Sequence, residues 1–356
     1  MDFTPSEEQA AAQGLAARIF GDLSTHDRLV AAGSATDAEL WKELCAAGLP
    51  GAVEETGLLG LVLLAEEQGR TTAQVPFVAS CVYGLLAVAG HGTDEQRGRL
   101  LPPLRDGTAV VAGALPARGT VRAEPGGGPV GALPPAAGGR LSGGVPLVPW
   151  LRDATHVLVA DEERSLWIVR ITDPGVVTEP VETTAPWSAG RLVLDAAPAE
   201  RLGGPEAYEE VLATARTAFA GVQAGVCAGS LARAVAHTAT REQFGRPLST
   251  NQAVLLRAAD AYMDTEAIRV TAYEAAWRRD EGLSHGAQAL NAAWWASEAG
   301  RRVVHAGQHL HGGTGADLDH PVHRHFLWGR QLDAYLGGSG TVLQELGELL
   351  VKEGPE

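Results

Sequence analysis

The spacing of apolar residues changes twice along the chain. Up to about residue 110, apolar residues recur at helical spacing or fill short apolar segments, for example at 6–20 and 60–69, which predicts helices. Between 111 and 200 the apolar runs are short and are bounded by glycine, proline or aspartate, as in antiparallel strands of a small barrel. These runs are 110–115, 144–149, 155–160, 165–170 and 190–195.

Helical spacing returns from residue 205 and predicts two long helices, at about 205–240 and 252–281. The pattern therefore predicts an N-terminal helical domain (1–110), a middle β domain (111–200) and a C-terminal helical bundle (201–356). Thr93 with Gln96, and Ser249 with Gln252, have the spacing of capping boxes that begin helices.

A polar loop joins the two long helices and combines three kinds of side chain. Arg241 offers a planar cation that suits phosphate oxygens, Gln243 an amide for a ribose or a ring edge, and Phe244 a stacking face. From spacing alone, a surface turn anchored by a buried Phe244 is the simpler interpretation.

Composition narrows the class of partner and the compartment. The formal charge of -15 argues against nucleic acid as a partner, although a local arginine cluster would still bind a small anion. Three scattered cysteines, no signal peptide and no apolar run long enough to span a bilayer predict a cytoplasmic protein without a membrane span.

Two further patterns have simple structural interpretations. His305 and His309 have the spacing of two metal ligands on one helix face, but the stretch lacks the glutamate of a zinc hydrolase motif, and no metal is expected. Gly221, Gly225 and Gly229 recur every four residues, which favours close packing of a helix, or close approach of a cofactor, at this face.

The loop at 241–248, Arg-x-Gln-Phe-Gly-x-Pro-Leu, and a second glycine-rich turn at 308–315 resemble the acyl-CoA dehydrogenase family. The resemblance implies a mainly α fold with a small β domain: an N-terminal helical domain, a middle β-barrel and a C-terminal four-helix bundle. It also implies FAD, whose pyrophosphate and adenosine are bound across a subunit interface. The residues that would bind FAD are Arg241, Gln243, Phe244, Gln252, Gln308, Gly312 and Gly313.

The chain departs from the family where the catalytic base is expected. The two positions that hold a glutamate in family members fall here on Leu336 and Ala215, and neither side chain can accept a proton. Arg216 matches a family arginine near the substrate. The Thr-Glu-Pro and Gly-Ser-Asp segments that touch the flavin are missing from 112–120. The nearby carboxylates Glu209, Glu210, Asp333 and Glu345 are interpreted as solvated groups.

This combination resembles the base-lacking subunit of bacterial heterotetrameric acyl-CoA dehydrogenases, some of which act on sterol side chains. The resemblance implies α,β-dehydrogenation of an acyl-CoA, with the glutamate supplied by a second dehydrogenase-like subunit and electrons passed to an electron-transfer flavoprotein or similar acceptor. Self-oligomerisation stays open. So do two alternative functions: a flavin-dependent oxidase or monooxygenase of a biosynthetic pathway, and a non-catalytic structural partner.

Overall fold

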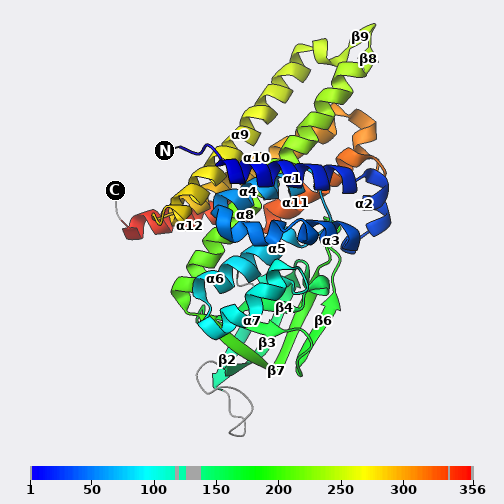
Figure 1. Cartoon of the computed structure of the whole chain (residues 1–356). Helices are drawn as coiled ribbons and strands as arrows, with labels where there is room; N and C mark the ends of the chain where they lie inside the picture. The colour runs from blue at the N-terminus through cyan, green and yellow to red at the C-terminus, as the bar shows by residue number, and fades with distance from the viewer. Residues whose placement is uncertain (1, 117–119, 126–137, 336, 354–356) are drawn as a thin grey trace. The chain divides into compact units, whose positions relative to one another are not determined.

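The computed structural model describes residues 2–116, 120–125, 138–335 and 337–353 (Figure 1). Two compact units divide the chain. The helical unit comprises Met1–Ala31, Thr56–Ala73 and Arg216–Glu356, and the sheet unit comprises Ala32–Glu55 and Gln74–Ala215. The mainly α fold with a small β part is confirmed, whereas the three-domain division at 110 and 200 stays a prediction.

Long helices build the helical unit. They are α1 (Glu7–Leu23), most of α2 (His26–Ala32), the second part of α4 (Leu49–Thr71), most of α8 (Pro205–Thr240), α9 (Gln252–Asp280), α10 (Gly286–Leu310), α11 (Pro321–Tyr335) and α12 (Ser339–Glu353). Helix α4 bends at Gly57, which has a φ of 72°. Beyond this bend Asp280, the last residue of α9, accepts hydrogen bonds from the amides of Leu58 and Leu59 and so caps the new helical start.

Helices α4 and α8 pack backbone against backbone. A Cβ atom added at Gly225 would lie 2.0 Å from the carbonyl oxygen of Glu66, and one added at Gly69 would lie 2.0 Å from that of Val222. Real Cβ atoms do not approach so closely, so only glycine fits at these two positions. The glycine repeat on α8 therefore serves close helix packing, one of its two predicted roles.

A short hairpin joins α8 to α9 at one end of this helix pair (Figure 1). It consists of β8 (Glu242–Gln243), β9 (Arg246–Pro247) and a 3-10 turn at Leu248–Thr250. Phe244 and Gly245 both have positive φ, of 56° and 75°, as the two central residues of such a turn require. The predicted capping box is wrong here, because Asn251 caps α9 and accepts a hydrogen bond from the amide of Ala253.

The sheet unit contains one curled seven-stranded sheet. Its order is β1-β4-β5-β7-β3-β2, and β6 also pairs with β7. The strands are β1 (Val111–Ala114), β2 (Thr120–Pro125), β3 (Gly138–Val148), β4 (His156–Ala160), β5 (Leu166–Arg170), β6 (Val176–Pro180) and β7 (Gly190–Gly203). The five predicted apolar runs all lie on strands. Two strands, β2 and β6, lack such a run, and β1 pairs with β4 in parallel instead of the expected antiparallel direction.

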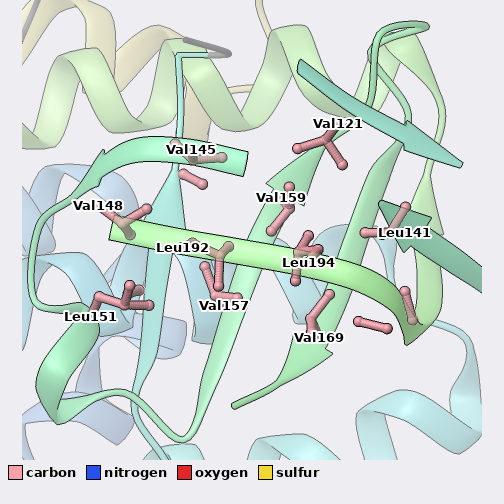
Figure 2. Packing of buried hydrophobic residues seen from close by; sticks show 14 residues of the cluster. Val121, Leu141, Val145, Val148, Leu151, Val157, Val159, Val169, Leu192 and Leu194 are labelled. Atoms are coloured by element: carbon pink, nitrogen blue, oxygen red, sulfur yellow. The ribbon is translucent and has the colours of Figure 1, made fainter. Parts of the chain in front are cut away.

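Aliphatic side chains from these strands form the core of the sheet unit. Figure 2 shows Val145, Val157, Val159, Leu192 and Leu194 among residues of this cluster, which share one buried interior. The described helices and turns of the unit also include α3 (Ala38–Ala46), the first part of α4, α5 (Phe77–Ser80), the π-helical turn Cys81–Leu86, α6 (Ala87–His91), α7 (Asp94–Arg105), the 3-10 turn Leu151–Asp153 and the first part of α8. The predicted capping box of Thr93 and Gln96 begins α7 and is confirmed.

Within the described residues, α8 is the single unbroken helix long and apolar enough to cross a membrane by length and composition. The sequence analysis did not recognise this run. Of its most apolar window, 72% is buried inside the protein, so these side chains already have protein neighbours, as in the core helix of a bundle.

Candidate functional site

A hollow of about 600 Å³ lies in the helical unit where the end of α8 and the hairpin meet the end of α10. It is lined by His237, Arg241, Gln243, Leu248, Val254, His309, Leu310, His311, Gly312, Gly313 and Thr314. Four of the seven residues predicted to bind FAD thus lie on its wall, although the two motifs that carry them are separated by about sixty residues of sequence.

The glycine-rich turn presents its backbone to this hollow. Gly312 has a φ of 62° and begins the 3-10 turn Gly312–Ala316. A Cβ atom added at Gly312 or Gly313 would meet nothing within 4 Å, so both backbones border open space. Gln308 donates a side-chain hydrogen bond to the carbonyl of Gly315 at 3.1 Å. Gln308 therefore shapes the turn from behind and does not line the hollow.

Arg241 also lines the hollow. Its amide donates to the carbonyl of His237 at 2.9 Å, and its own carbonyl accepts from the amide of Leu248 at 2.9 Å, which ties the two sides of the hairpin together. Within the described part of the chain the side chain of Arg241 forms no ion pair. A guanidinium with free donors beside backbone amides suits an anionic group such as a diphosphate.

Two predicted ligands point elsewhere in this single chain. Phe244 is 101% exposed and Gln252 is also exposed, and neither lines the hollow. The interpretation of Phe244 as a buried anchor of the turn is therefore wrong. A fully exposed aromatic ring at a positive φ is unusual. The cofactor-binding roles of Phe244 and Gln252 stay predictions, because neither residue lines the hollow of this chain.

Three histidine rings contact one another at the hollow: the ring of His237 stacks on that of His311, and the ring of His320 lies edge-on to His311. The sequence analysis did not identify them as a group. The rings of His237 and His311 are 4.6 Å apart at an interplanar angle of 26°, and those of His311 and His320 are 5.0 Å apart. Burial, His311 and Arg241 lower the pKa of His237. The available signal was the spacing of four residues between His237 and Arg241, which brings two residues close together at the end of a helix.

The region of the expected base contains an ion pair. Arg216 is 7% exposed, and its Nη2 donates to Oε2 of Glu345 on α12 at 2.5 Å, while its Nε has no hydrogen-bond partner among the residues that the structure describes. Ala215 is buried and Leu336 lies outside the described residues.

The carboxylates interpreted as solvated all have partners. Besides Glu345 with Arg216, these are Glu209 with Arg164, Glu210 with His91, and Asp333 with Ser297 and Arg330. None of these four carboxylates lines the hollow.

In the sheet unit, the stretch expected to face a flavin is packed into the protein. Ala112 and Leu115 are buried, and Ala117–Gly119 lie outside the described residues. Trp150 is 3% exposed, has a φ of 62° and stacks on Trp187 with ring centroids 6.0 Å apart.

A second hollow, of about 610 Å³, lies between α9 and α10. It is lined by Arg257, Asp260, Ala261, Met263, Asp264, Arg302, His305, Ala306 and His309. His305 and His309 therefore share one wall. No group of three or more histidine, cysteine, aspartate or glutamate side chains in the described chain could hold a metal ion.

Comparison with known proteins agrees with this geometry. Residues 6–108 match the model of the acyl-CoA dehydrogenase N-terminal domain, and residues 203–348 that of the C-terminal domain. Acyl-CoA dehydrogenase FadE27 of Mycobacterium tuberculosis is 35% identical over 99% of each chain.

Two solved structures are similar over nearly the whole length. A variant of the Tcur3481-Tcur3483 steroid ACAD is 43% identical with a TM-score of 0.87 and covers 98% of both chains. The ChsE4-ChsE5 complex from Mycobacterium tuberculosis is 31% identical with a TM-score of 0.91 and covers 100% of both. From this identity, this coverage and both matched domains, it follows that the chain belongs to the acyl-CoA dehydrogenase family.

Proposed function

We propose that this chain is one subunit of a heteromeric FAD-dependent acyl-CoA dehydrogenase acting on a steroid-type acyl-CoA, and that it contributes the diphosphate-binding half of a FAD site while an unlike subunit contributes the base. The observation that carries the proposal is that Arg241, Gln243 and the Gly312–Gly313 turn line one hollow.

The residues of the hollow fit a dinucleotide diphosphate. The guanidinium of Arg241 would bind phosphate oxygens, and the open backbones of Gly312 and Gly313 allow an approach that any side chain there would hinder. Gln243 would bond a ribose or the edge of the adenine. FAD held there would supply the family's acceptor for the hydride that leaves the β carbon of the thioester.

Location on the surface of one subunit supports a shared site. The loop residues 241–246 are all exposed, and Phe244 has no cover in this chain. A cofactor bound here would touch only part of its surface, whereas cofactor sites commonly bury most of the ligand. A second subunit would complete the enclosure and exclude water from the flavin.

The lack of a base supports an unlike partner. The side chains of Ala215 and Leu336 cannot accept a proton, and Glu345 forms an ion pair with Arg216. Removal of the α proton needs a carboxylate within hydrogen-bond reach of it. The similar Tcur3481-Tcur3483 steroid ACAD and ChsE4-ChsE5 complex are each named for two components, which favours the same arrangement here.

The decisive experiment is to purify the chain alone and together with a co-encoded relative that carries the glutamate, and to measure flavin per chain and native mass. We expect stoichiometric FAD only in the mixed assembly, at about one flavin per pair of unlike chains, with dehydrogenation of a steroid acyl-CoA and reduction of an electron-transfer flavoprotein or similar acceptor.

Other results would select the alternatives. A homo-oligomer that holds one FAD per chain would overturn the heteromer and favour flavin-dependent oxidation or hydroxylation. A mixed assembly whose flavin does not touch this chain, so that Arg241→Ala leaves its affinity unchanged, would make the chain a structural partner.

A further inference from the structure

The last turn of α8 places a second potential cation next to Arg241. His237 lies in the last turn of α8, Arg241 follows the last residue of this helix, and the amide of Arg241 donates to the carbonyl of His237 at 2.9 Å. Both residues line the same hollow as the Gly312–Gly313 turn. We propose that His237 is an anion-binding residue of this site and takes up a proton when the cofactor diphosphate binds. This inference rests on the proposed function.

Hydrogen bonds distinguish His237 from His311 and His320. Nδ1 of His311 lies 2.7 Å from the carbonyl oxygen of Gly307, which can only accept, so this nitrogen carries a hydrogen. Nδ1 of His320 accepts from the amide of Val322 at 3.2 Å, so protonation there would break the bond. Within the described chain the ring of His237 has no hydrogen-bond partner, and both its nitrogens are available to a ligand.

The charged and titratable groups around His237 oppose a positive charge as long as no anion is present. Arg241 follows the end of α8, His311 follows the end of α10 and stacks on the ring, and His309 of α10 lines the same hollow. The ring of His320, before α11, lies edge-on to His311. Arg233 lowers the pKa of His320, and Asp317 raises it. Burial, His311 and Arg241 lower the pKa of His237, so the ring is neutral at neutral pH.

A diphosphate would reverse this balance. Two negative charges beside the ring favour the imidazolium, so the pKa of His237 rises on binding and one proton is taken up with the ligand. By linkage, affinity for the diphosphate must then fall as pH rises through the interval between the free and the bound pKa. A structural histidine that only fills space between helices would produce no such slope.

The test is the pH dependence of diphosphate binding. FAD bound to the assembled protein is followed by flavin fluorescence, and ADP-ribose bound to the chain alone by calorimetry; both ligands carry a diphosphate without a titrating terminal phosphate. Since one pKa unit corresponds to tenfold in affinity, we expect wild-type binding to be weaker by about five- to tenfold at about pH 8 than at about pH 6. Calorimetry in two buffers of different ionisation enthalpy should show proton uptake.

His237→Gln should bind with the high-pH affinity at both pH values and without proton uptake. His305→Gln is the matched control, because His305 is exposed on the wall of the second hollow and its pKa is also lowered by burial. It should keep the wild-type slope.

Two results would overturn the inference in distinguishable ways. His237 would be excluded as the linked group if the wild type showed no pH dependence of binding, or if His237→Gln kept the same pH dependence as the wild type. Either result would leave the half-site intact. Failure of wild type to bind either ligand at any pH would instead remove the proposed half-site itself.

Discussion

Two parts of the helical unit use glycine for opposite purposes: the buried stretch of α8 at 225–229, here called the buried end, and the hairpin that follows α8, here called the exposed end. At the buried end, Gly225 and Gly229 allow contact with the backbone of α4, and the carbonyl of Glu66 occupies the place of a Cβ atom. At the exposed end, Gly245 has a φ of 75° and would meet nothing within 4 Å if a Cβ were added. Phe244 beside it is fully exposed.

This contrast separates residues that stabilise the fold from exposed residues that are available to bind a ligand or a partner. Close packing at Gly225 is required by neighbours in the same chain, so changes there act on stability. Residues 241–246 of the hairpin are all exposed, so changes there should act on what binds to it. Predictions that compare the two ends test whether stability and binding really separate in this way.

The largest effect is expected at the buried end. Gly225→Val would force side-chain atoms against the backbone of Glu66 and should lower the free energy of unfolding by about 3 kcal/mol or prevent folding. Gly14→Val on the exposed face of α1 has open space and should change it little. Urea unfolding measures both. A Gly225 variant as stable as Gly14→Val would mean that α4 and α8 are not packed this closely.

At the exposed end, Arg241→Ala should leave the unfolding curve unchanged and weaken FAD binding in the assembled protein. Loss of a charged hydrogen bond typically costs about 2 kcal/mol, or roughly thirtyfold in affinity. Arg246→Ala is the control, since Arg246 lies in the same hairpin and outside the wall of the hollow. Equal loss in both variants would indicate a general electrostatic effect instead of a specific contact.

The buried end should also respond to pH through His325. This residue is 1% exposed, and its Nε2 lies 3.0 Å from the carbonyl of Arg70, close beside Gly229. Carbonyl oxygens near both ring nitrogens favour the charged form, but complete burial, with smaller effects of Arg233 and Arg324, dominates and lowers the pKa of His325 to about 4.

The sign of this effect follows from linkage. Because the folded pKa lies below the unfolded value of about 6.5, the unfolded state binds the proton first as pH falls, and stability is lost between about pH 6.5 and 4. His325 should therefore cost about 2 kcal/mol at pH 5 relative to pH 8. Urea titrations at both pH values should show this loss in wild type and in the exposed control His309→Gln, and a smaller loss in His325→Gln. An unchanged loss in His325→Gln would assign it to other groups.

The smallest stability effect is expected for Phe244→Ala. The ring buries no surface in this chain, so thermal unfolding should change by less than about 0.5 kcal/mol. Phe219→Ala is the contrast, because that ring is 3% exposed and packs edge-on against Tyr335 at 4.8 Å, and it should cost about 3 kcal/mol or more. If Phe244→Ala also leaves FAD binding unchanged, the predicted stacking role of Phe244 is wrong.

Local pattern was enough to predict much of this protein. Apolar spacing predicted the long helices and five of the strands, because these periods follow directly from which face of an element is buried. The hairpin at 241–248 and the glycine turn at 308–315 were recognisable as motifs, since each depends on a few consecutive residues. Strands β2 and β6 were missed because β2 lies mostly exposed and β6 has little buried surface to impose a pattern.

Tertiary structure alone decided which of these residues meet. The gathering of Arg241 with Gly312, the stacking of His237 on His311 and the pairing of Arg216 with Glu345 join positions far apart in sequence. The parallel direction of β1 against β4 likewise depends on how the chain returns to the sheet. Periodicity records whether a side chain is buried, but it does not record which distant side chain shares that space, because many packings satisfy the same pattern of burial.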